Sequence, residues 1–377
     1  MTGGAELKFS VKKVLGYCLL LFCIILSILF VNLNYTFYDR PIAKVIETVL
    51  EETTATTDRH GNEDTLFTQH ITAQMKNGPQ KGMLISLQND YSYSGAYDQE
   101  YRVGNDLFVL PDEQVAGADN LTGIITDVKR DKHALIIAWI FIFALMIVGK
   151  RQGVFAIISF ALNVLILSFA LDIYVNNPSV NLLLICGICI LLFTCISLVF
   201  VSGFSEKTYA AIVATLVGTV ASLAIALLVL RLTSDNGLRY EEMQFVTRPY
   251  RLVFIGGLFI GSLGAIMDIA ITLSSSMFAL YEKDRSLSRK ALKESGMDIG
   301  QDIMGTITNI LFLAYICGSI PMLVLSFKNG TPLGFTFSMN LSLEVTRALV
   351  GGIGIVLTIP IAVYTSLFFI DRKKARL

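Results

Sequence analysis

Apolar runs separated by short polar breaks occupy most of the chain, and one long polar segment interrupts them. The runs lie near residues 14–31, 134–149, 154–172, 180–201, 209–232, 251–280, 303–327 and 345–370. An α-helix needs about 20 apolar residues to cross the hydrocarbon core of a bilayer. The pattern therefore predicts an α-helical polytopic membrane protein with about eight transmembrane helices.

The polar segment between the first two runs changes to the period-two pattern of β-strands. Apolar and polar positions alternate over 66–75 and again over 83–87, and turn-forming sequences at 76–79 and 103–106 separate the candidate strands. We expect a small antiparallel β-rich domain here, either a barrel or a short sandwich. One face of the strand predicted over 66–75 should carry Phe67, Gln69, Ile71, Ala73 and Met75.

Three regions result from these patterns. Residues 1–33 form a tail and a transmembrane anchor helix, 34–133 the β-rich domain, and 134–377 a seven-helix transmembrane bundle. The first run resembles a signal peptide, but its apolar stretch is longer than that of a typical signal peptide, which has about 7–15 residues. No small-x-small cleavage site follows it. We therefore expect an uncleaved anchor.

Composition excludes a soluble globular protein and narrows the possible partners. The 377 residues are 54% hydrophobic and only 16% charged, against about 25% charged in soluble domains. The thirty basic and thirty acidic residues give a net charge of zero, so the chain has no overall positive electrostatic field that would favour the binding of nucleic acid. The lipid bilayer is the expected environment.

No cofactor or metal site is expected from the cysteines and histidines. All six cysteines lie inside apolar runs, including the C-x-x-C pair Cys186 and Cys189. Because no second pair and no histidine lies nearby, helix packing is favoured over zinc.

Charge asymmetry predicts the orientation. Eight spans place both termini on one side, and the positive-inside rule makes that side the cytoplasm. The β-rich domain is then extracytoplasmic. The cytoplasmic segments carry Lys8, Lys12, Lys13, Lys150, Arg151, Lys207, Lys283, Arg285, Arg289, Lys290, Lys293, Arg372, Lys373, Lys374 and Arg376, whereas the opposite short loops carry Arg231, Arg239, Arg248, Arg251 and Lys328.

The run 251–280 contains an acidic residue near its middle, Asp268. Such residues are costly in hydrocarbon, and they usually face a bundle interior or an aqueous path. Steps of three and four residues place small and hydroxyl residues on the same helix face. A packing seam and a proton or cation site both remain open for this face, which carries Gly257, Gly261, Gly264, Asp268, Thr272 and Ser275.

Two further runs carry polar residues on one face. Asp302, Thr306 and Asn309 open the run 303–327, where Asp302 either stabilises a helix N-terminus or contributes to a path. Arg347 shares a face with Gly351 and Gly354 in the last run. It either pairs with an intramembrane acid or, as we favour, extends to the interface. The basic stretch 282–296 between runs six and seven predicts an interfacial connecting helix.

Three blocks of sequence resemble the YibE/F family of bacterial membrane proteins. They are GFSEKTYAAIVATLVGT at 203–219, GSLGAIMDIAITLSSSMFAL at 261–280 and ESGMDIGQDIMGTITNILFLAYICGSIPMLVL at 294–325. The resemblance extends over nearly the whole chain. It implies a multi-pass protein of the bacterial cytoplasmic membrane with a transport-related role.

Three functions are compatible with these features. The favoured one is a proton- or ion-coupled secondary transporter or permease in which Asp268 is the protonatable group, and Thr272, Asp302, Thr306, Asn309 and Arg347 line its path. A non-transporting subunit that binds an envelope partner or a second copy is the main alternative. An intramembrane aspartyl protease using Asp268 and Asp302 is disfavoured, because its sequence signatures are missing. We expect no enzymatic activity.

Overall fold

The computed structural model describes residues 11–95, 98–112, 121–177, 179–243 and 249–376. The chain divides into two compact units, Met1–Ala144 and Leu145–Leu377.

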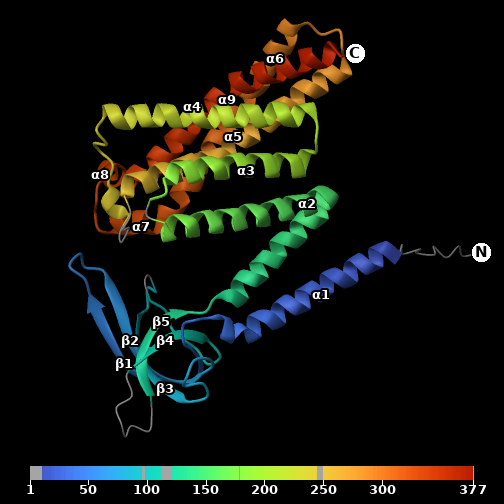
Figure 1. Ribbon diagram of the computed structural model, residues 1–377. Helices are drawn as coiled ribbons and strands as arrows, with labels where there is room; N and C mark the ends of the chain where they lie inside the picture. Colours follow the sequence, from blue (N-terminus) through green and yellow to red (C-terminus); the bar gives the residue numbers. More distant parts are fainter. Residues whose placement is uncertain (1–10, 96–97, 113–120, 178, 244–248, 377) are drawn as a thin grey trace, which may run out of the picture. The chain divides into compact units, whose positions relative to one another are not determined.

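The first unit combines a β-barrel with the helices that precede and follow it in the chain. Helix α1 (Val11–Leu33) leads through the short 3₁₀ turn η1 (Asn34–Phe37) into five strands, after which α2 begins at Asp131. The strands form a closed barrel in the order β1-β2-β3-β5-β4 (Figure 1). Their bounds are β1 (Ile42–Thr57), β2 (Glu63–Met75), β3 (Leu84–Ser92), β4 (Asp106–Pro111) and β5 (Leu121–Val128).

Alternation along the strands builds the barrel core. In β2, the inward positions Gln69, Ile71, Ala73 and Met75 are buried and the residues between them are partly exposed, as their pattern predicts. Of the two predicted arrangements, barrel or short sandwich, the structure has the closed barrel. The sheet is not wholly antiparallel as predicted, because β3 and β5 pair in parallel. Met83 is 40% exposed because it precedes β3, so the alternation predicted for it was wrong.

A buried polar network joins α1, the barrel and the start of α2. Lys129, whose side chain is 1% exposed, pairs with Asp131 at 3.3 Å and donates to the Val31 carbonyl at 2.8 Å. The Tyr38 hydroxyl donates to the same Asp131 carboxylate at 2.5 Å. This hydrogen bond, helped by burial and the negative charge, raises the pKa of Tyr38 to about 12. The phenol therefore stays protonated and donating at physiological pH.

The second unit is a helical bundle around α5 and α9. Half of the residues in the most apolar stretch of each of these two helices are buried. Helix α9 packs against α4, α5 and α6, and α5 packs also against α3 and α4. The bounds are α2 (Asp131–Asn176, shared with the first unit), α3 (Leu182–Ser202), α4 (Glu206–Leu232), η2 (Tyr240–Glu242), α5 (Tyr250–Lys283), α6 (Arg289–Ile316), η3 (Cys317–Ser319), α7 (Ile320–Lys328), α8 (Leu333–Asn340) and α9 (Ser342–Lys374).

Most predicted spans correspond to helices, and two boundaries differ. Within the described residues, seven helices are long and apolar enough to cross a membrane. The predicted spans 134–149 and 154–172 both lie in α2, which is interrupted at Lys150, where φ is 47° and ψ is −121°. The predicted connecting helix 282–296 was wrong: α5 continues to Lys283, and Ser288 caps a new helix, α6, that continues to Ile316. The polar first turns of α6 concealed this start from the hydropathy pattern.

Close helix contact in the bundle depends on glycine. A Cβ on Gly218 of α4 would collide with the Thr358 hydroxyl of α9, and one on Gly354 would lie 2.6 Å from Ile266 Cδ1 of α5. A hydroxyl group adds a hydrogen bond between these helices, since Ser222 of α4 donates to the Val350 carbonyl of α9 at 2.8 Å. Small residues allow this approach and hydroxyls strengthen it, as is usual between membrane helices.

Replacing Gly218 by alanine should lower thermal stability. The added methyl group meets Thr358, which is short, β-branched and held by its own bond to the Gly354 carbonyl at 2.6 Å. Overpacking of this kind costs about 1–3 kcal/mol. Gly264→Ala is the matched control, because nothing lies within 4 Å of that position. Equal melting temperatures for the two variants, purified in detergent, would contradict a close contact between Gly218 of α4 and Thr358 of α9.

Replacing Lys129 by methionine should loosen the network in the first unit. Breaking a buried pair costs about 3–5 kcal/mol, and we expect about 2–3 kcal/mol here because the Asp131 side chain remains 24% exposed. Arg130→Met is the control, since Arg130 forms only a solvent-exposed pair with Asp127 at 3.9 Å. Thermal unfolding, followed by fluorescence, compares the two variants. If the Lys129 variant is as stable as the Arg130 variant, Lys129 does not stabilise the first unit.

Candidate functional site

Asp268 lies near the middle of α5 on a face that the bundle leaves uncovered. Among the described residues, no hydrogen bond or ion pair reaches its carboxylate, and its side chain is exposed. It is the nineteenth residue of a 34-residue helix, about 27 Å along the axis from Tyr250 at 1.5 Å per residue. A carboxylate at this depth is either protonated, hydrated or covered by another polypeptide.

The five predicted packing glycines fall into two groups. Gly351 and Gly354 are buried, and a Cβ on Gly351 would collide with Leu311 of α6. Gly261 lies against the Tyr315 hydroxyl of α6. Gly257 and Gly264 have open space where a Cβ would stand, on the same face as Asp268. The structure thus gives three of them a neighbour within this chain, and it leaves a shallow, small-residue surface beside the acid.

The predicted polar face of α6 is also exposed. Asp302, Thr306 and Asn309 follow one another on the outer side of the helix. The opposite side of α6 packs on α9 through Gly300, where a Cβ would collide with Ile359. Asp302 lies well inside α6, which begins at Arg289, so it does not stabilise the N-terminus of that helix. That alternative for Asp302 is wrong.

Asn309 lines an apolar groove between α6 and α9. The groove has a volume of about 620 Å³, and Thr308 and Gly352 contribute to it from facing helices. The Thr308 hydroxyl is buried and has no hydrogen-bond partner among the described residues. An apolar groove with one amide and one unpartnered hydroxyl resembles a binding surface for a small, mostly apolar group.

Arg347 pairs within its own helix. Its guanidinium lies 2.7 Å from Glu344 and stacks over the Phe254 ring at 5.4 Å from the centroid. The two side chains are 24% and 20% exposed. Arg347 therefore has a partner in the first turns of α9, and no ion pair connects it to Asp268 among the described residues.

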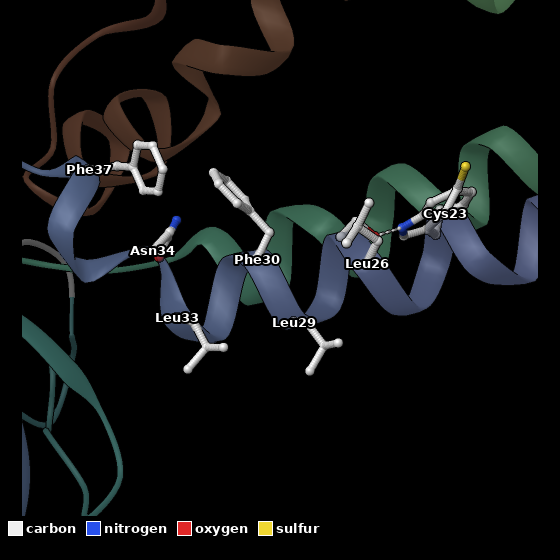
Figure 2. Close-up of a pocket in the computed structure, with 9 residues that line it drawn as sticks. Cys23, Leu26, Leu29, Phe30, Leu33, Asn34 and Phe37 are labelled. Carbon is white, nitrogen blue, oxygen red and sulfur yellow. Dashed lines mark hydrogen bonds between the residues drawn. The ribbon is translucent and has the colours of Figure 1, made fainter.

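A second apolar groove belongs to the first unit. Figure 2 shows Leu26, Phe30 and Phe37 of the α1 region around it, with Cys23 at one end. Its volume is about 740 Å³. Trp139 of α2 contributes to it and donates from its indole nitrogen to the Ser27 hydroxyl at 2.9 Å. In a bilayer, such a surface contacts lipid or another helix.

Sequence patterns did not reveal the two grooves or the buried Thr308 hydroxyl. Thr308 immediately precedes Asn309, and the helical periodicity placed only Thr306 and Asn309 on the polar face. A groove depends on the spacing of two helices, which local patterns do not contain. Within the described part of the chain, no cluster of His, Cys, Asp and Glu is able to hold a metal ion.

Comparison with known families covers most of this architecture. Residues 36–128, which contain the barrel, match the YibE/F family N-terminal domain. Residues 137–372, which contain most of α2 and the helices that follow it, match the YibE/F-like protein family. No curated protein and no solved structure matches the chain. The two matches cover nearly all of the sequence, and the chain belongs to the YibE/F family.

Proposed function

We propose that this YibE/F family member is a proton- or ion-coupled secondary transporter, with Asp268 as the group that binds the coupling ion. The observation that carries the proposal is the exposed Asp268 carboxylate in the middle of α5, beside the open surface of Gly257 and Gly264. Leaving an ionised group against lipid costs about 2.5–3.5 kcal/mol on insertion scales. A hydrated path or a covering helix removes that cost.

The exposed face of α6 and its groove supply the rest of the proposed path. Thr272 continues the Asp268 face by one turn, and Asp302, Thr306 and Asn309 add polar groups along α6. The groove of Thr308 and Asn309 offers space for the apolar part of a substrate. Arg347, engaged by Glu344, serves in this scheme as a fixed positive charge near one end of α9.

We place the chain in the bacterial cytoplasmic membrane with eight crossings. Helix α2 has 46 residues and would be about 69 Å long if continuous, roughly twice the hydrocarbon thickness of about 30 Å. The interruption at Lys150, with exposed Lys150 and Arg151, divides it into two crossings. Both termini are then cytoplasmic and the barrel is extracytoplasmic.

The barrel supports a second candidate function, binding of an envelope partner. Strand β1 pairs with β4 from Ile42 to Lys44, and from Glu47 onward no described residue pairs with that edge of the strand. Val49 and Leu50 are 52% and 55% exposed along that part. A free strand edge with exposed apolar side chains is able to accept an extended segment of another protein. In this role the bundle would act as an anchor.

Cysteine accessibility tests for the proposed hydrated path. Gly264→Cys and Thr272→Cys, in a background without other cysteines, should react with a membrane-impermeant thiosulfonate, because that reagent needs water. Val220→Cys on α4 is the control, since Val220 is mid-span and 59% exposed on an apolar surface. Reaction of the Gly264 and Thr272 variants no faster than the Val220 variant would exclude a water-filled path at Asp268.

Substitution of Asp268 tests its role in proton movement. Purified protein in liposomes with an imposed membrane potential should acidify the lumen faster in the wild type and in Asp268→Glu than in Asp268→Asn, because only a carboxyl exchanges the proton. An internal pH indicator measures the rate. Asp172→Asn is the control, since Asp172 lies near the end of α2 and bonds Asn176 at 2.9 Å. Equal rates for the wild type and Asp268→Asn would remove Asp268 from any proton path.

A further inference from the structure

A small polar cavity lies where three helix ends meet, away from the Asp268 region. It has a volume of about 170 Å³, formed by the start of α4 and the ends of α5 and α9. A water molecule takes about 30 Å³ in the liquid, so the cavity has room for about five or six water molecules or a small polar ligand. Its polar lining consists of Ser205, Glu206, Lys207, Ser275, Glu282 and Lys373.

Part of this lining is already paired within the chain. Lys373 contacts Glu282 at 2.9 Å, and Arg376 contacts one oxygen of Glu206, Oε1, at 3.5 Å. The Ser205 hydroxyl is 2.8 Å from the Thr208 hydroxyl. These contacts hold the three helix ends together and fix the carboxylates in place.

Three polar groups in the lining lack a partner among the described residues. The second Glu206 oxygen, Oε2, is buried and accepts no hydrogen bond. Lys207 interacts electrostatically with Glu282 but forms no ion pair within 4.0 Å, and the Ser275 hydroxyl forms no hydrogen bond. A ligand with both a donor and an acceptor would pair the free acceptor and the free cation of this cavity.

The groups that remain unpaired identify the ligand class. Arg376 and Lys373 already engage the two carboxylates, Glu206 and Glu282, which leaves the Lys207 ammonium and the second Glu206 oxygen, Oε2, without a partner among the described residues. A ligand that meets both groups carries a negative charge for Lys207 and a donor for Glu206, as a zwitterion does. A group that combines a phosphate with a primary ammonium places acceptors at Lys207 and Ser275, and donors at Glu206.

We propose that this cavity binds a phosphoethanolamine group, as the headgroup of an ethanolamine phospholipid. Each of the three helices is long and apolar enough to cross a membrane, and the cavity lies at their ends, the level of lipid headgroups. Phe204, 81% exposed, and Tyr209, 43% exposed, lie beside it in the chain. Aromatic side chains of this kind concentrate at membrane interfaces. The site requires neither Asp268 nor transport.

Native mass spectrometry of the full-length protein tests the site. Protein purified from vesicles of equal parts ethanolamine, choline and glycerol phospholipid should retain the ethanolamine lipid about tenfold over the others, the ratio expected for one charge-assisted hydrogen bond. Choline keeps the zwitterion but has no N–H to donate to Glu206, and glycerol lacks the ammonium. Addition of soluble phosphoethanolamine shows whether the acyl chains contribute: displacement indicates a site for the free group, and retention a lipid site.

Variants connect the preference to the cavity. Glu206→Gln should lose the tenfold preference, and Lys207→Gln should lower the retention of all three lipids because they share the phosphate. Lys290→Gln is the control: its side chain is 86% exposed, and it should keep both the preference and the retention. Ser275→Ala removes one hydroxyl that would donate to the phosphate, without changing any charge. It should lower lipid retention severalfold, and it remains a test if the charge variants fail to fold. Equal retention of the three lipids by the wild type, an unchanged preference in Glu206→Gln, or unchanged retention in Ser275→Ala would overturn the proposal.

Discussion

The close contact of α9 with α4 and α5 is the constraint on which the bundle depends. In a bilayer, apolar side chains gain little from leaving lipid, so helices associate through close packing and interhelical hydrogen bonds. Gly218, Gly354, Thr358 and Ser222 supply both at one place. A second hydroxyl pair, Ser274 and Ser366 at 3.1 Å, joins α5 to α9 two to three turns further along. These contacts fix α5, and with it the position of Asp268.

The same helix therefore has two distinct faces. Its inner face carries Ile266, Ile269 and Leu273, all completely buried. Its outer face carries Gly264 and Asp268, which no other residue of the described bundle covers. The two candidate functions make different use of this outer face: the proposed transporter needs water and a substrate there, whereas a subunit that binds its partner through the barrel needs only lipid or another polypeptide to cover it.

Sequence predicted the elements well and their mutual arrangement less well. Helix existence followed from run length, and the barrel followed from the alternation that buries Ile71 and Ala73. The boundaries of α6 were missed because its first turns are polar and its Ser288 cap resembles an ordinary loop residue. Which polar side chains face a neighbour depends on helix rotation and spacing. Periodicity therefore placed Gly257 and Gly261 on one face but could not tell that only Gly261 meets Tyr315.

Ser275 connects the two regions of α5 that carry unpaired polar groups. It lies seven residues after Asp268, two helical turns or about 10 Å along the same face, with Thr272 between them. Ser275 also lines the cavity at the end of the helix. A polar stripe thus extends from the helix end to its middle. A ligand seated in the cavity would therefore lie at the end of that stripe, two helical turns from Asp268, and the two proposals share Ser275 without depending on each other.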